Sequence, residues 1–173
     1  MGSLLDRLRS GGDPEPDLPN PETGLSKHDV HNIKRTWATL QADGETHGMQ
    51  MFLRLFRMNP DTRTYFTTIK DMDEGQIKSS YKFKAHVVTV LSFFNAVVCN
   101  LDQPAVVEVL MTKMGETHRQ RKVDAKHFDE IKTILMEILK KDVAVGDDAA
   151  RSWERFINYM YQHSLSKKVD TKV

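Results

Sequence analysis

Apolar residues recur at intervals of three and four along almost the whole chain from Ser26 onward. Residues with that spacing share one face of an α-helix, so the pattern predicts amphipathic helices. The predicted apolar stripes are Val30, Ile33, Trp37 and Leu40; Met51, Phe52, Leu55 and Phe56; Phe83, Val87, Val90, Leu91, Phe94 and Val98; Val107, Leu110, Met111 and Met114; Phe128, Ile131, Leu135 and Ile138; and Ala150, Trp153, Ile157, Met160 and Tyr161. No strand pattern intervenes. We therefore predict an all-α fold of about seven to eight helices.

Short polar stretches mark the ends of these predicted helices. Ser26 and Asp29 resemble a capping box, while Asn59 suits an N-cap and Pro60 the first turn of a short third helix. The remaining breaks fall at residues 102–104, at Asp124 and at residues 143–148. Helices of such unequal length do not make a symmetric bundle, and no internal repeat is visible. We therefore expect something irregular in the interior.

Length and composition restrict the function classes. A chain of 173 residues falls within the range of one domain with a sizeable core. With 25 Lys+Arg against 24 Asp+Glu, it offers no basic footprint for nucleic acid. No apolar run approaches a membrane span, and the first residues lack the apolar core of a secretion signal, so we expect a cytoplasmic protein without a transmembrane segment. The only cysteine, Cys99, excludes an intrachain disulfide, and we expect it to be buried.

The N-terminal end differs from the rest in composition. Residues 11–24 contain four of the six prolines and almost nothing apolar, so we predict a flexible tail over residues 1–24. The folded domain is then expected over residues 25–166, with a short C-terminal tail at 167–173. Gly2 is placed as for N-myristoylation, but Asp6 stands where that motif has Ser or Thr, so lipid anchoring stays an open alternative. The oligomeric state is open as well.

Two of the seven histidines lie on apolar faces of predicted helices. His86 shares a face with Phe83 and Val90, and His118 follows Met114 by four residues. A buried imidazole needs a partner, so each is either a hydrogen-bonded core histidine or a ligand. The other histidines are expected to be solvated: His28, His31, His47, His127 and His163. His28 and His31 could share a zinc ion by spacing, but no further residues complete four ligands.

The order of these landmarks resembles the globin family over roughly residues 25–165. An aromatic pair, Tyr65-Phe66, lies in a polar stretch soon after Pro60, and the matching landmarks in chain order are Trp37, Pro60, Phe66, His86, Val90 and His118. The resemblance implies a helical fold around a haem b group. It implies that His118 is the proximal iron ligand and His86 the distal histidine. It also implies haem contacts from Phe66, Val90, Phe52, Phe83, Met114, Val123 and Phe128.

Some positions depart from the family pattern. Val87 stands where many globins carry glycine, so we expect a slightly wider helix crossing near Gly48. Thr89 cannot reach a haem propionate, and the alternatives for that pairing are Lys70, Arg119, Arg121 and Lys122. Three features resemble neuroglobin and globin X within the family: Phe52, the short link after His118 and the N-terminal extension. Many invertebrate intracellular globins share these traits.

The resemblance implies reversible binding of dioxygen and other diatomic ligands at iron. His118 is expected to donate its second ring N–H to a backbone carbonyl near Met114 or to the Thr117 hydroxyl. His86 either donates a hydrogen bond to bound dioxygen or binds the iron itself. The alternative function is therefore a bis-histidyl, six-coordinate globin with a redox, nitric oxide, nitrite or signalling role. Nothing in the sequence indicates an enzyme, since no nucleophilic triad, phosphate loop or paired acid and base is present.

Overall fold

The computed structural model of the chain describes residues 17–165, and all regular structure in that range is helical, as the apolar pattern predicts. The α-helices are α1 (Lys27–Ala42), α2 (Gly44–Met58), α3 (Glu74–Ser79), α4 (Tyr81–Cys99), α5 (Pro104–Gln120), α6 (Ala125–Glu137) and α7 (Asp147–Leu165). A 3₁₀-helix, η1 (Pro60–Tyr65), follows α2, and a π-helical turn, η2 (Ile138–Asp142), continues α6.

The helix starts follow from local side-chain chemistry. Ser26 and Asp29 form the predicted capping box, in which each side chain accepts the other residue's backbone N–H. Asp73 and Gln76 form a second box that opens α3, a helix the apolar pattern does not reveal because it buries only Ile77. The prediction for Asn59 is wrong in one respect. It precedes η1, but its side chain makes no capping hydrogen bond.

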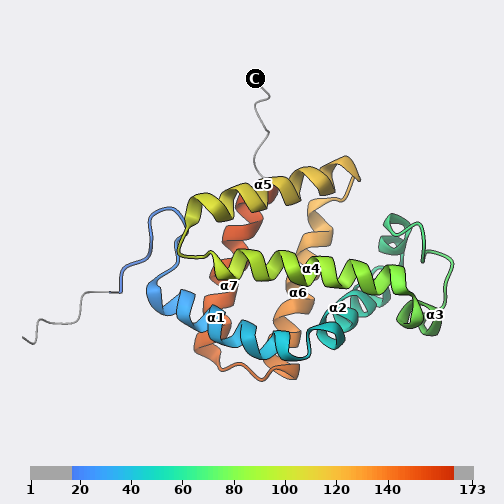
Figure 1. The fold of residues 1–173 in the computed structure, drawn as a ribbon, viewed down its shortest axis with the longest axis horizontal. Coiled ribbons are helices and arrows are strands. Elements are labelled where there is room, and N and C mark those ends of the chain that lie inside the picture. The colour runs from blue at the N-terminus through green and yellow to red at the C-terminus, as the bar shows by residue number, and fades with distance from the viewer. Residues whose placement is uncertain (1–16, 166–173) are drawn as a thin grey trace, which may run out of the picture.

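The helices are stacked in crossing layers (Figure 1). α4 and α5 lie across the face nearest the viewer, and α6 and α7 cross behind them. α1 packs on α7 and α4, while α2 packs on α4 and α6. The largest fully buried side chains include Trp153, Phe83, Phe156 and Met111. These come from α4, α5 and α7, so the core holds α4 and α5, which carry the two candidate histidines, in fixed positions.

α2 and α4 cross in close contact at Gly48. A Cβ atom at Gly48 would lie 2.6 Å from Cγ1 of Val87. Real Cβ atoms essentially never approach another heavy atom so closely, so the crossing depends on glycine at this position. Val87 on α4 has therefore not removed the close approach of the two helices. The crossing sets α2 directly beside the turn of α4 that carries His86.

Two predictions about single residues are wrong. Cys99 is exposed, because it lies at the last turn of α4 on the side away from the core. His127 is buried, because its ring contacts Tyr65 of η1 at a centroid separation of 5.1 Å and its Nδ1 meets the backbone at Asp124. Both errors arise from helix packing, which local sequence does not show.

The predicted tails lie only partly within the described residues. Residues 1–16 and 166–173 are outside them, and so is Gly2. Residues 17–24 contain a turn in which the Asn20 side chain accepts the backbone N–H groups of Glu22 and Thr23, and Thr23 is buried. The last part of the predicted flexible tail is thus a hydrogen-bonded turn next to α1.

One described helix, α4, is long and apolar enough to cross a membrane by length and composition alone, with a mean hydropathy of 1.3. Only 22% of that stretch is buried. However, α4 packs on α1, α2, α3 and α5, and Phe83 and Val87 on it belong to the core. This position fits a core helix of a folded domain.

Candidate functional site

His118 lies on α5 with its ring oriented by the backbone of its own helix. Its Nδ1 lies 2.9 Å from the carbonyl oxygen of Met114, one turn earlier. A carbonyl only accepts, so Nδ1 carries a proton, and in the neutral ring the lone pair lies on Nε2. Of the two partners expected from sequence, the structure shows the carbonyl, since the Thr117 hydroxyl donates to the carbonyl of Lys113 at 2.8 Å. The arrangement presents Nε2 as a ligand atom.

His86 lies on α4 among three aromatic rings. The ring centroid of Phe52 lies 5.0 Å from that of His86, and Phe66 lies at 5.1 Å, both edge to face. Phe83 stacks on the imidazole at 6.5 Å. Burial lowers the pKa of His86, and the positive charge of Arg121 lowers it further. The imidazole is therefore neutral at ordinary pH, with a lone pair available.

The two histidines lie on neighbouring helices, His86 on α4 and His118 on α5, and these two helices contact each other. Of the residues predicted to surround a cofactor, Phe52 and Phe83 are buried, while Phe66, Val90, Met114, Val123 and Phe128 are half-buried. The ring centroid of Phe128 lies 5.2 Å from that of His118. The structure thus places Phe52, Phe66 and Phe83 on the His86 side and Phe128 on the His118 side.

The chemistry of these residues fits an iron porphyrin. Among the described residues no group of three or more His, Cys, Asp or Glu could hold a metal ion. Two imidazoles alone cannot complete the coordination of a metal, so a metal here needs a cofactor that supplies the remaining ligands. Haem iron takes one or two axial histidines and an apolar surround, and this site provides both.

Sequence reasoning missed the polar contacts that hold η1 near this site. The Asn59 side chain donates to a carboxylate oxygen of Glu130 on α6 at 3.0 Å. Arg63 donates to the carbonyls of Ile69 and Met72 and closes the loop after η1. From sequence, Asn59 is interpreted as an N-cap and not as a residue that contacts another helix. No local signal pairs it with a residue 71 positions away.

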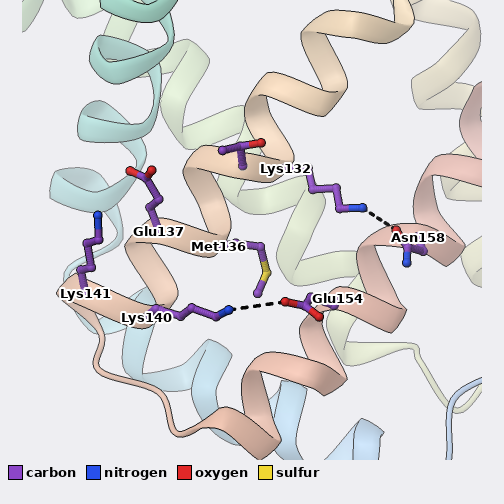
Figure 2. Close-up of a pocket in the computed structure, with 8 residues that line it drawn as sticks. Lys132, Met136, Glu137, Lys140, Lys141, Glu154 and Asn158 are labelled. Atoms are coloured by element: carbon purple, nitrogen blue, oxygen red, sulfur yellow. Dashed lines mark hydrogen bonds and ion pairs between the residues drawn. The ribbon is translucent and has the colours of Figure 1, made fainter.

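Two surface grooves lie elsewhere on the molecule. The groove in Figure 2 has a volume of about 410 Å³ and is lined by α6, η2 and α7. Lys140 pairs with Glu154 across it at 3.5 Å, and Lys132 donates to Asn158 at 2.6 Å. A second groove of about 580 Å³ runs along α2 and is also lined with charged side chains. Neither contains a histidine, so neither resembles the site at His86 and His118.

The described residues form a helical fold in which His86 and His118 lie beside aromatic rings on neighbouring helices. A sequence model of the globin family matches residues 49–164, and the chain belongs to the globin family. It is thus a haem-binding globin, and oxygen binding is typical of that family.

Individual relatives agree with this assignment. The chain is 32% identical over 128 residues to the Globin-2 A chain of Anadara inaequivalvis, covering 73% of this chain and 84% of the relative. It is 29% identical over 154 residues to Cytoglobin-2 of Danio rerio, covering 87% and 82% respectively. Among these relatives are both an invertebrate globin and a vertebrate one.

Solved structures share the fold. Hemoglobin from the botfly Gasterophilus intestinalis superposes with a TM-score of 0.74 at 22% identity, covering 81% of this chain and 96% of that one. A hexacoordinated heme protein from an anhydrobiotic tardigrade gives 0.76 at 19% identity, with 83% and 95% covered. Hexa-coordinate hemoglobin of Drosophila melanogaster gives 0.75 at 19% identity, with 80% and 92% covered.

Proposed function

We propose that this globin binds haem b through Nε2 of His118 and reversibly binds dioxygen and other diatomic ligands on the His86 side. The observation that carries the proposal is the hydrogen bond from His118 Nδ1 to the Met114 carbonyl, which fixes the tautomer that an iron ligand needs. When bound, the haem supplies the iron at which a diatomic ligand adds. The residues of the chain bind the group, orient it and exclude water.

Each named residue has a physical role in this proposal. His118 holds the iron and is itself oriented by α5. Phe66, Val90 and Phe128 offer apolar surface to the porphyrin. His86 can donate a hydrogen bond from a protonated ring nitrogen to a bound ligand that carries partial negative charge. Lowering of its pKa by burial keeps the ring neutral, with one N–H and one lone pair.

A second candidate is the six-coordinate, bis-histidyl globin with a redox, nitric oxide, nitrite or signalling role. The observation that favours it is the aromatic enclosure of His86, because a neutral imidazole held among Phe52, Phe66 and Phe83 has its lone pair available to iron. The tardigrade and Drosophila proteins that share the fold are described as hexacoordinate. Both candidates use the same two histidines and differ in what occupies the sixth position.

His118→Ala tests the first candidate. The purified variant should lose haem or lose the spectrum of a histidine-ligated iron, while His31→Ala, which removes an exposed histidine of α1, should keep both. Unchanged haem content and spectrum in His118→Ala would contradict the assignment of the iron ligand.

The ferrous spectrum without added ligand separates the two candidates. A low-spin, sharply split spectrum that becomes high-spin in His86→Leu, together with faster ligand binding, supports six-coordination. A broad high-spin spectrum in the unsubstituted protein favours the dioxygen carrier with an open sixth position.

The cellular location, the N-terminal modification and the oligomeric state of the protein can each be tested. We propose a cytoplasmic globin that is not an enzyme and whose role, as a dioxygen carrier, is oxygen transport or storage. Cell fractionation tests the location, and mass spectrometry of the native protein tests whether Gly2 carries an acyl group, since myristoylation adds a fixed mass to the N-terminal peptide. Sedimentation of the purified protein gives its oligomeric state.

A further inference from the structure

We propose that Asn59 and Glu130 form a clasp that positions Phe66 against His86 and thereby slows ligand binding at the iron. The clasp is the hydrogen bond from Asn59 Nδ2, just before η1, to Glu130 Oε1 on α6, at 3.0 Å. The inference rests on the proposed function, because it concerns the His86 side of the same site. It makes Asn59 and Glu130 positioning residues, which act through other side chains.

η1 needs tertiary contacts to stay in place. It spans six residues with 3₁₀ geometry, and such short helices have poor hydrogen-bond geometry and little stability of their own. The structure ties it to α6 at both ends. Asn59 bonds Glu130 at the start, and Tyr65 packs against His127 at the end, with ring centroids 5.1 Å apart.

Phe66 follows η1 directly, so the position of η1 sets the position of its ring. The backbone N–H of Phe66 donates to the carbonyl of Arg63 inside η1 at 2.9 Å. Its ring meets His86 at 5.1 Å and Phe52 at 5.7 Å. A displacement of η1 is therefore transmitted through one residue to the ring beside His86.

One buried oxygen on η1 and one on α6 lack hydrogen-bond partners within the described residues. These are the Thr62 hydroxyl oxygen on η1 and the second carboxylate oxygen of Glu130 on α6. Buried oxygens without partners destabilise a fold, so an apolar contact would hold η1 to α6 at least as well. What the Asn59 to Glu130 bond provides is a fixed geometry, since a hydrogen bond is directional and an apolar contact is not.

Asn59→Ala removes the hydrogen bond of the clasp without removing a helix cap. The Asn59 side chain makes no capping hydrogen bond to η1, so its removal takes no local cap away. Glu130→Ala breaks the same bond from the α6 side. Glu130→Gln keeps an amide oxygen that can accept from Asn59 and is the conservative rescue. Asn158→Ala is the matched control, because it removes a hydrogen bond from Lys132 on α6 that has no connection to η1.

The measurement is the rate constant for carbon monoxide binding to the ferrous haem protein after flash photolysis. Asn59→Ala and Glu130→Ala should each bind about fivefold faster, which corresponds to about 1 kcal/mol. The double variant should be no faster than either single variant, because both break one bond. Glu130→Gln and Asn158→Ala should stay within about twofold of the unsubstituted protein, a difference of about 0.4 kcal/mol.

Two further measurements isolate the route through Phe66 and His86. The acceleration should vanish in a His86→Leu background, where no imidazole remains to be positioned. In the protein without haem, the nuclear Overhauser effect between ring protons of Phe66 and His86 should weaken in Asn59→Ala and persist in Asn158→Ala. This readout needs no haem, so it judges the clasp even if the haem spectrum contradicts the proposed function.

Unchanged carbon monoxide binding in both clasp variants would overturn the inference. Additive effects in the double variant, an equal effect of Asn158→Ala, or an acceleration that persists in His86→Leu would each overturn it as well. Circular dichroism shows whether Glu130→Ala loses its fold. In that case the comparison of Asn59→Ala, expected to bind carbon monoxide faster, with Glu130→Gln, expected to be unchanged, tests the inference.

Discussion

Gly48 shows how a single residue controls the distance between α2 and α4. A Cβ at this position would lie 2.6 Å from Cγ1 of Val87, a fully buried β-branched side chain with no room to move. We expect Gly48→Ala to lower the free energy of unfolding by about 1–3 kcal/mol, the usual range for overpacking, despite the better helix propensity of alanine. Urea unfolding of the haem protein measures the change.

Gly44→Ala is the matched control for that substitution. Its Cβ would lie 3.3 Å from Cδ1 of Leu91, the far end of a flexible side chain that can shift by a few tenths of an ångström. The change in unfolding free energy should be smaller than for Gly48→Ala or favourable. Equal losses at both positions would show that backbone freedom, and not the contact with Val87, accounts for the effect.

At the residue scale, the sequence predicts on which side of a helix a residue lies better than it predicts which elements pack against that residue. The period of α4 and α5 places His86 and His118 on apolar faces, and the two helices contact each other in the structure. The burial of His127 and the exposure of Cys99 depend on which element packs over them. η1 packs over His127, whereas no element within residues 17–165 covers Cys99. Local pattern cannot supply that information.

At the scale of elements, α1 and α7 are joined by a polar contact around Asp29. Its carboxylate accepts from the Arg155 guanidinium at 2.5 Å, from the Ser152 hydroxyl at 2.7 Å and from the Ser26 backbone N–H at 3.1 Å. Burial by itself would raise the pKa of Asp29, but these hydrogen bonds outweigh it and lower the pKa from 3.8 to about 2. The ionised form is therefore favoured in the folded state.

This contact predicts a loss of stability in acid. Because the folded pKa lies below the ordinary value, the contribution is fully present above about pH 4 and is lost as the pH falls from there through 2. A shift of this size corresponds to about 2 kcal/mol. Asp29→Asn should lower the free energy of urea unfolding at neutral pH by about this amount, and the difference from the unsubstituted protein should shrink between pH 4 and pH 2.

The control for Asp29 is an exposed ion pair. Asp102 pairs with Lys34 at 3.3 Å on the surface, and exposed pairs contribute little to stability because solvent and salt screen them. Asp102→Asn should therefore change unfolding much less than Asp29→Asn at neutral pH. A difference between Asp29→Asn and the unsubstituted protein that stays constant down to acid pH would contradict the role of its ionised carboxylate.

The elements that the sequence predicts are those with a long apolar stripe. α3 buries only Ile77, so it has no stripe, although its capping box of Asp73 and Gln76 is a local signal that could have revealed it. The π-helical turn η2 continues the apolar run of α6 and is not distinguishable from it by period. Helix boundaries that are set by capping residues can be predicted from the local sequence. A change from α-helix to π-helix depends on packing and cannot.

At the scale of the whole molecule, we expect folding and cofactor binding to be coupled, because the two proposed iron ligands lie on two helices of the core. His86 is on α4 and His118 on α5, and half-buried apolar side chains on both helices, such as Val90 and Met114, have surface left for a bound porphyrin to cover. A group that binds only the folded state raises its apparent stability by mass action. The family could be predicted from sequence for the same reason, since the landmarks that build the site also build the core.

The last prediction concerns removal of haem. With haem at about a thousand times its dissociation constant, binding adds about 4 kcal/mol to the folded state. For a chain of this size that raises the melting temperature by about 8–16 °C, at about 2–4 °C per kcal/mol. Thermal unfolding followed by circular dichroism, with and without haem, measures the difference. His118→Ala should remove most of the rise, because the iron then has no ligand on α5, whereas His31→Ala should keep it. A protein that melts at the same temperature with and without haem would show that the group does not bind between the core helices, and His118 would then have to be explained as a core histidine held by the Met114 carbonyl.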